Sequence, residues 1–261
     1  MTRGNGVEAV IGEHQQQALD TFGFRAAVPL FRAIGEDADH LATGTFVAVG
    51  EKLILLTARH ILDQSAPEDI AIPETPEGSV LRTLGNLVIH KPIDVPETEI
   101  DIVGIEIQDQ ETIDIIEAGW RVVHMAIGAE ADANGEVVLI GYPSATLDKK
   151  DMRITGRPTG IVTALIGGIP ANATPPTNAT LDLFLQLPRK AIATAGAVVD
   201  IPPIHGMSGC AIWQLLDTGS SKLWYPDCAL RLVGIQSSAR PGSYIRGKRW
   251  AYIHHLLKNF T

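Results

Sequence analysis

Short runs of apolar residues, or of alternating apolar and polar residues, recur along most of the chain. Alternation is typical of half-buried strands, and short apolar runs bounded by turn residues are typical of fully buried ones. Turn-rich segments separate the runs, for example residues 66–78 and 167–180. Many short strands in one chain favour a β-sandwich or closed barrels. The predicted strands lie at residues 26–34, 43–49, 52–57, 86–90, 101–107, 136–141, 159–166, 181–187, 209–215 and 230–237.

Three segments break this strand-like rhythm. Residues 7–22 are rich in helix formers and predict a short N-terminal helix. Residues 110–134 are acidic and partly helical in pattern, and we interpret them as the link between two β units. Near the end of the chain, apolar residues at helical spacing predict a C-terminal helix over 249–260, packed through Trp250, Ile253, Leu256 and Leu257.

Composition places the chain among soluble globular proteins. Of its 261 residues, 45% are hydrophobic and 20% are charged, which is close to average and excludes a disordered or collagen-like chain. The 25 glycines and 16 prolines interrupt the chain too often for long helices. A net charge of −9 argues against a nucleic-acid partner and against docking on an anionic membrane.

No apolar run reaches membrane-spanning length, and the N-terminal residues lack the pattern of a signal peptide. The two cysteines, Cys210 and Cys228, cannot build a disulfide framework, and we expect free thiols. These features predict a cytoplasmic protein. The histidines, including His254 and His255, have no partner ligands at metal spacing, and no phosphate-binding loop is present. We therefore expect neither metal nor cofactor.

Three polar residues lie at the ends of predicted apolar strands or in a turn before one, and we consider them candidate catalytic residues. His60 follows the strand predicted at 52–57, Asp101 opens the strand predicted at 101–107, and Ser208 lies in a glycine-rich turn before another apolar run. Taken singly, each has an ordinary structural reading: a hydrogen-bonded histidine, a solvated aspartate or a β-turn serine. Together they contain the residue types that nucleophilic serine catalysis requires.

A serine hydroxyl becomes a useful nucleophile only when a neutral imidazole can accept its proton. The imidazole in turn needs a carboxylate that fixes its tautomer and stabilises its cation. Gly206 and Gly209, on either side of Ser208, permit a tight turn whose backbone N–H groups can converge on a developing oxyanion.

In this order, the residues resemble those of the chymotrypsin-like (trypsin-fold) serine peptidases. The likeness covers roughly residues 26–258. Five segments carry it, in chain order. The first three are similar to the family's Thr-Ala-x-His signature, its aspartate-containing strand and its Gly-Asp-Ser-Gly-Gly signature. The last two are similar to the strand that lines the family's substrate cleft and to its Pro-Gly-x-Tyr segment. The five segments are Thr57-Ala58-Arg59-His60, Asp101-Ile102-Val103, Gly206-Met207-Ser208-Gly209, Leu232-Val233-Gly234-Ile235 with Ser237, and Pro241-Gly242-Ser243-Tyr244.

The resemblance implies an all-β fold of two six-stranded antiparallel β-barrels with the active site in the cleft between them, plus short N- and C-terminal helices. Two apparently unpaired cysteines and the lack of a signal-peptide pattern point to an intracellular branch, so the chain resembles the bacterial-type intracellular trypsin-like peptidases. The expected units are an N-terminal extension at 1–23, a first barrel at 24–115, a linker at 116–134, a second barrel at 135–248 and a terminal helix at 249–261.

The resemblance also implies a role for each site residue. Ser208 would be the nucleophile, His60 the general base and then general acid, and Asp101 the residue that orients His60. The backbone N–H groups of Gly206 and Ser208 would form the oxyanion hole. Ser237 would sit behind Asp101 as a candidate hydrogen-bond donor to it.

Met207 departs from the family pattern. Many secreted members have an aspartate there, which pairs with a newly cut N-terminus and assembles the oxyanion hole. Methionine cannot form that ion pair, so we expect no such zymogen cleavage. The turn is then either formed constitutively or ordered by a partner.

The implied substrate pocket is uncharged. Pro202 stands where the family forms the pocket floor, which argues against cleavage after lysine or arginine. A small, apolar or uncharged polar side chain is favoured. The residues expected to line the substrate site are His205 at its rim and, along its walls, Gln236, Ser237, Ser238 and Gly242.

The sequence therefore supports two hypotheses. The first is a serine endopeptidase that forms an acyl-enzyme on Ser208 and acts on a peptide or protein substrate. The second is a catalytically silent or partner-activated module of the same fold that binds peptides or proteins. In the second case an activating or regulatory protein would be a further partner, and residues 1–22 are a candidate contact.

Overall fold

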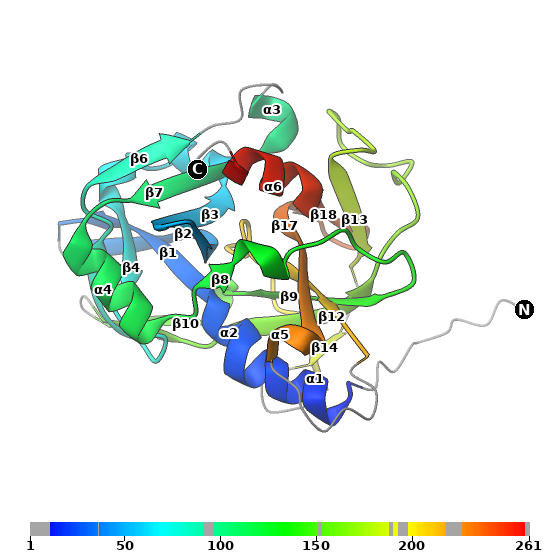
Figure 1. Cartoon of the computed structure of the whole chain (residues 1–261), viewed down its shortest axis with the longest axis horizontal. Helices are drawn as coiled ribbons and strands as arrows, with labels where there is room; N and C mark the ends of the chain where they lie inside the picture. Colours follow the sequence, from blue (N-terminus) through cyan, green and yellow to red (C-terminus); the bar gives the residue numbers. More distant parts are fainter. Residues whose placement is uncertain are drawn as a thin grey trace, which may run out of the picture.

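The fold consists of two β-sheets that lie against each other, with short helices around them (Figure 1). The computed structural model describes residues 11–35, 37–90, 97–150, 153–187, 190–192, 198–217 and 226–258. Most strands pair with their neighbours in the antiparallel sense. The expected all-β class, with two antiparallel β units and a C-terminal helix, is confirmed.

The first sheet follows the order β10-β11-β5-β4-β1-β2-β3-β7-β6, and β8 is added parallel to β2. Its central strands are long and almost wholly buried. In chain order its members are β1 (Ala27–Ile34), β2 (Asp37–Val49), β3 (Lys52–Ala58), β4 (Ile70–Pro73), β5 (Ser79–Thr83), β6 (Leu87–His90), β7 (Ile102–Ile107), β8 (Val123–His124), β10 (Leu147–Lys150) and β11 (Arg153–Gly156).

The second sheet follows the order β13-β18-β17-β16-β9-β12-β14-β15. In chain order its members are β9 (Glu136–Gly141), β12 (Thr159–Ala164), β13 (Asp182–Gln186), β14 (Lys190–Ile192), β15 (Val198–Asp200), β16 (Ala211–Leu215), β17 (Leu230–Arg240) and β18 (Tyr244–Arg249).

The hairpin β10–β11 connects the two halves of the chain. It follows β9 in sequence, yet β11 pairs with β5 through Arg153 opposite Val80. The second half of the chain thus contributes two strands to the first sheet. Over the described residues, the first sheet contains ten strands, two of them from this hairpin, and the second sheet contains eight.

The helices are short and lie at the margins of the sheets. α1 (Glu13–Ala18), α2 (Phe24–Ala26) and α5 (Pro226–Ala229) lie together at the bottom of Figure 1, while α4 (Gln110–Gly119) lies beside the first sheet. α3 (Glu97–Ile100) directly precedes β7. The expected C-terminal helix is α6 (Trp250–Lys258), and its buried residues are those predicted from the spacing: Trp250, Ile253, Leu256 and Leu257.

Alternating side chains of the central strands supply different apolar cores. In β3, Leu53 and Leu55 point into the core of the first sheet, whereas Ile54 and Leu56 join the core shared by both sheets. The second sheet has its own core, which includes Leu139 and Met207. The shared core, completed by α1 and α6, holds the two sheets in a fixed relation.

One expected loop contains a strand. Within the turn-rich segment 66–78, residues Ile70–Pro73 form β4, and all four are buried. Prolines and acidic residues around them conceal the pattern in the sequence. The strand forms because β1 and β5 offer hydrogen-bonding edges on both of its sides, through pairs such as Phe31–Ala71 and Ala71–Thr83.

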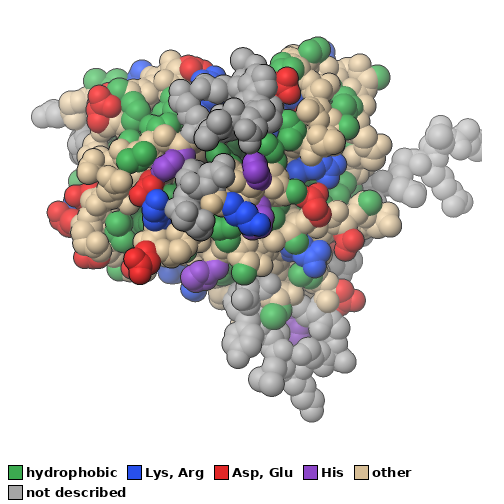
Figure 2. Space-filling view, turned by 45° about the horizontal axis from the view of Figure 1, so that its top comes forward, with side chains coloured by type: hydrophobic (Ala, Val, Ile, Leu, Met, Phe, Trp, Pro, Cys, Tyr) green, Lys and Arg blue, Asp and Glu red, His purple; other side chains and the backbone are tan. Residues whose placement is uncertain are grey.

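Acidic and basic side chains are interspersed on the face shown in Figure 2. None of the helices in the described part of the chain is long and apolar enough to cross a membrane.

Candidate active site

His60 and Asp101 meet at the end of the first sheet. His60 lies in a 3-10 helix, Arg59–Asp63, that begins where β3 ends, and Asp101 lies between α3 and β7. Because β3 and β7 are paired neighbours, the two side chains are brought together across the sheet. The His60 ring atom Nδ1 lies 2.9 Å from Asp101 Oδ2 and 3.2 Å from Oδ1.

Asp101 holds the main chain of His60 as well as its ring. The His60 N–H donates to Asp101 Oδ1 over 3.0 Å, and the Arg59 N–H donates to the Asp101 carbonyl oxygen over 3.2 Å. Asp101 has a φ of +44°, in the left-handed region that aspartate tolerates better than most residues. The buried side chains of Ile100 and Ile102 on either side anchor this turn.

The electrostatics of the pair suit a general base. The hydrogen bond that the His60 ring donates to the Asp101 carboxylate is the main cause that raises the pKa of His60 above its ordinary value of 6.5. Burial of the ring and the nearby Arg59 act in the opposite direction, and Asp63 adds a smaller upward effect. An imidazole beside a fixed carboxylate has a defined tautomer, with its Nε2 atom available to accept a proton.

The turn around Ser208 depends on its two glycines. Gly206 has a φ of +90° and Gly209 a φ of +86°. A Cβ atom at Gly209 would overlap the Thr43 carbonyl oxygen and would lie 2.7 Å from the backbone nitrogen of Ala58. The turn therefore packs its backbone directly against the end of β3, two residues before His60, which only glycine permits.

Two backbone amides in this turn are left without an acceptor. Within the part of the chain that the structure describes, neither the Gly206 N–H nor the Ser208 N–H donates a hydrogen bond. The intervening Met207 N–H, by contrast, donates to the Ile204 carbonyl oxygen. Most backbone amides of a folded protein are paired, so two unpaired amides beside a serine are what an oxyanion hole requires.

The turn is supported by residues that the sequence analysis did not select. The Thr43 hydroxyl donates to the Gly206 carbonyl oxygen over 3.0 Å and accepts from the Tyr142 N–H over 2.9 Å. On the other side, the Nδ1 atom of His40 lies 2.8 Å from the Ser144 hydroxyl, and a Cβ atom at Gly206 would overlap both side chains. No motif in the sequence marks these residues, because they meet the turn only in the folded chain.

Burial lowers the pKa of His40 to about 4, so this ring is neutral around pH 7. Its role in the structure is to pack against Gly206, beside the candidate oxyanion hole.

Ser208 lies in the same region as His60, but the two side chains are not bonded. Among the described residues, no hydrogen bond joins the Ser208 hydroxyl to His60. The Ser208 carbonyl oxygen accepts from the Thr43 N–H over 2.9 Å, which fixes the main chain of the turn to β2.

Met207 and Cys210 serve as packing residues of the second sheet. Met207 is 1% exposed and lies in the core of that sheet. Cys210 is fully buried, and the burial raises the pKa of its thiol, so it is held in the unreactive protonated form. Cys210 and Cys228 are both free thiols, as expected.

A pocket of about 320 Å³ opens beside the histidine–aspartate pair. It joins the end of the first sheet to strands β17 and β18 of the second. Its lining residues are Arg59, His60, Asp101, Pro175, Pro176, Ser237, Ser238, Arg246 and Lys248.

The expected substrate residues are distributed unevenly around this pocket. Ser237 and Ser238 line it, and Ser237 donates to the Arg246 carbonyl oxygen over 3.3 Å rather than to Asp101. Gln236 is buried, and its backbone binds the turn at Gly209 and Cys210. His205 is exposed beside the turn. Gly242 lies at the exposed tip of the β17–β18 hairpin and is not among the pocket-lining residues.

Comparisons with known proteins identify the fold of the chain. No family model and no curated protein matches the chain. Among solved structures, the scabies mite inactivated protease paralogue S-I1 is similar at a TM-score of 0.51 and 15% identity, over 96% of this chain and 98% of that one. The Rv3671c protease in its inactive form is similar at a TM-score of 0.51 and 13% identity, over 94% of this chain and 92% of that one. The chain therefore has the chymotrypsin-like protease fold.

Proposed function

We propose that the protein is a serine endopeptidase that hydrolyses peptide bonds through an acyl-enzyme on Ser208. The observation that carries the proposal is a juxtaposition at the end of β3. The imidazole of His60, bound to the Asp101 carboxylate, lies two residues after Ala58, on which Gly209 packs. In the adjacent turn, the amides of Gly206 and Ser208 donate no hydrogen bond within the described parts of the chain.

In the proposed reaction, His60 Nε2 takes the proton from the Ser208 hydroxyl as its oxygen attacks the substrate carbonyl carbon. The N–H groups of Gly206 and Ser208 donate to the oxyanion that forms. Asp101 stabilises the imidazolium, which then protonates the leaving amine as the peptide C–N bond breaks. A water molecule, activated by the same imidazole, hydrolyses the ester and regenerates the Ser208 hydroxyl.

The resting geometry requires a small rearrangement of the nucleophile. The Ser208 hydroxyl must come within hydrogen-bond distance of His60 Nε2 for the proton to be transferred. Hydrogen bonds of catalytic groups are often long before substrate binds and tighten in the complex.

A fluorophosphonate probe tests the proposal, because it reacts only with an activated serine hydroxyl. We expect labelling of the wild-type protein, none in Ser208→Ala, and normal labelling in the control variant Ser243→Ala at the β17–β18 hairpin. Peptide mapping of the labelled protein should place the adduct on Ser208. Equal labelling of the wild type and Ser208→Ala, or no labelling of either, would show that Ser208 is not the nucleophile.

A second candidate function is supported by the missing bond between Ser208 and His60. In this alternative the chain is a silent or partner-activated module that binds peptides or proteins. Both comparison structures are also described as inactive. Probe labelling without peptide hydrolysis would favour activation by a partner, whereas absence of both, with retained binding of peptides from a library, would favour a binding module.

A further inference from the structure

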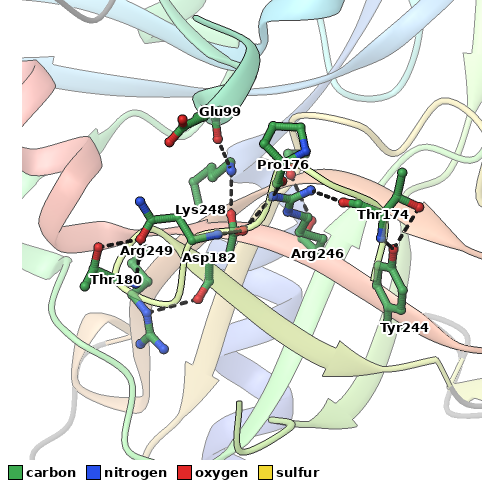
Figure 3. A network of polar contacts seen from close by, with 11 residues as sticks. Glu99, Thr174, Pro176, Thr180, Asp182, Tyr244, Arg246, Lys248 and Arg249 are labelled. Carbon is green, nitrogen blue, oxygen red and sulfur yellow. Dashed lines mark hydrogen bonds and ion pairs between the residues drawn. The ribbon is translucent and has the colours of Figure 1, made fainter. Parts of the chain in front are cut away.

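A buried charge cluster lies behind the candidate site, between β13 and β18 (Figure 3). The Asp182 side chain is completely buried and accepts from both Arg246 and Lys248. Antiparallel pairing places Asp182 opposite Lys248, with Arg246 two residues along the same strand. One carboxylate thus pairs with two cations. The buried charge of Asp182 is tolerated because these two ion pairs compensate for its lost hydration.

The two cations use their remaining donors in different directions. Arg246 donates to the carbonyl oxygens of Thr174 and Pro176, which precede β13. Lys248 reaches the opposite way and donates to the carbonyl oxygen of Glu99 in α3, as Figure 3 shows. Lys248 therefore joins the second sheet to the helix that immediately precedes β7 of the first.

Glu99 stands two residues before Asp101. α3 is only four residues long, so its carbonyl groups have almost no helical hydrogen bonds of their own and need outside donors. A lysine at the carbonyl end of a helix is a favourable donor. Lys248 is 2% exposed and is held by Asp182, so it presents this donor at a fixed position.

Asp101 needs such support because its conformation is strained and its own side chain is used for His60. Its φ is +44°, and its carboxylate accepts from the ring and the main chain of His60. Ser237, the neighbouring hydroxyl on β17, donates to the Arg246 carbonyl oxygen instead. Among the described residues, the hydrogen-bonded link from the second sheet to this segment runs through Lys248 and the Glu99 backbone. It adds to the apolar packing of Ile100 and Ile102 in the shared core, which does not fix the direction of a polar group.

We propose that Lys248 is a positioning residue: anchored on Asp182, it clamps the Glu99 carbonyl and so holds Asp101 in the geometry that orients His60. The catalytic meaning of this clamp rests on the proposed function. The effect of the clamp on the geometry of the His60–Asp101 pair can be tested without measuring any activity.

The test is an NMR titration of His60 in protein labelled with ¹⁵N-histidine, assigned with a His60→Gln variant. The charged groups that act on His60 are Asp101, Arg59 and Asp63, and the Asp101 hydrogen bond is the largest influence. In Lys248→Met, we expect the His60 pKa to fall toward 6.5 and the Nδ1–H resonance to weaken or move upfield, because Asp101 no longer holds a fixed position.

The direction of the shift separates positioning from charge. Loss of a cation near Asp101, by itself, raises the pKa of His60, since the imidazolium loses a repulsive neighbour. The matched control is Arg246→Met, which removes a cation from the same Asp182 carboxylate but leaves the contact with Glu99 intact. We expect its His60 pKa to stay unchanged or to rise. A rise or no change in Lys248→Met, or an equal fall in both variants, overturns the proposal.

Fluorophosphonate labelling adds a functional readout. We expect the labelling rate of Lys248→Met to fall by roughly tenfold to a hundredfold, as displaced catalytic groups commonly do. Labelling of the wild type tests the proposed function separately: if the wild type does not label while the His60 shift occurs, the peptidase proposal fails and the clamp stands. If the wild type labels and His60 does not shift, the clamp fails alone.

Lys248→Gln provides a second variant if Lys248→Met does not fold. Glutamine can still donate to Asp182 but is too short to bind Glu99 as well, so it should give the same downward shift of the His60 pKa. Failure of both variants to fold, while Arg246→Met folds, would assign Lys248 to stability and count against a positioning role.

Discussion

Asp101 holds His60 at two points: its carboxylate lies 2.9 Å from the ring atom Nδ1 and accepts from the His60 backbone N–H over 3.0 Å. The ring and the main chain of the histidine are therefore tied to one side chain. Such a double attachment restricts both the position and the rotation of the imidazole, which leaves its Nε2 atom facing a defined direction. The consequences of this relationship, and of the turn beside it, can be tested in five ways.

Asp101→Asn should abolish most activity without unfolding the protein. An amide can replace the carboxylate in shape, but it does not stabilise the imidazolium and can select the wrong tautomer. In proteases with this arrangement, the corresponding loss is on the order of 10⁴-fold in rate. Fluorophosphonate labelling rates at pH 8 would measure it, with circular dichroism as the control for folding. A variant that labels within about threefold of wild type would contradict the role given to Asp101.

The labelling rate should depend on pH through His60. Because the folded-state pKa of His60 is raised, the ring remains protonated to a pH above 6.5 and cannot accept the serine proton there. The rate should therefore be low at pH 6 and should increase as the pH rises through this pKa. Rate profiles from pH 5 to 9 provide the measurement. A flat profile would exclude His60 as the base.

The same shift has a consequence for stability with a definite sign. A raised pKa in the folded state means that the folded protein binds the proton more tightly than the unfolded chain does. The stabilisation from the His60–Asp101 pair is fully present below pH 6.5 and is lost as the pH rises through the folded-state pKa. Urea unfolding at pH 6 and pH 9 should give a smaller pH-dependent change in His60→Gln than in wild type. An identical change in both proteins would contradict the linkage.

Gly209→Ala should damage both stability and labelling, because the new methyl group would meet the Thr43 carbonyl oxygen and the Ala58 nitrogen. Gly242→Ala is the matched control: its φ is also positive, at +70°, but a Cβ atom there meets nothing within 4 Å. We expect the control to lose about 1 kcal/mol and Gly209→Ala to lose at least about 2 kcal/mol. Urea denaturation measures both. Equal losses would mean that the close packing of the turn on β3 is unimportant.

Thr43→Val should destabilise the oxyanion turn with little change in side-chain volume. It removes the hydroxyl that binds the Gly206 carbonyl and the Tyr142 N–H and leaves both buried, at a cost of about 1–3 kcal/mol. Thr45→Val, on the same strand, is the control because the buried Thr45 hydroxyl has no hydrogen-bond partner in the described structure. We expect that variant to be neutral or slightly stabilised. Similar unfolding free energies for the two variants would refute the role of Thr43.

Local patterns in the sequence were sufficient to predict the fold class and the local surroundings of each candidate residue. Alternation and short apolar runs identified most of the longer strands, and helical spacing identified α6 with its four buried residues. These features depend on neighbours within a few positions, so they are visible in one dimension. The glycines at 206 and 209 were also recognisable, since a turn beside a serine needs their conformational freedom.

The distant residues that support the site could be identified only from the folded chain. The Thr43 hydroxyl binds a carbonyl 163 residues away, and Lys248 binds one 149 residues away. β4 forms inside a segment that resembles a loop because two other strands supply its hydrogen bonds. In each case the energetic reason is a donor or acceptor that becomes buried on folding and must find a partner, and that partner is set by strand register across the fold rather than by local sequence.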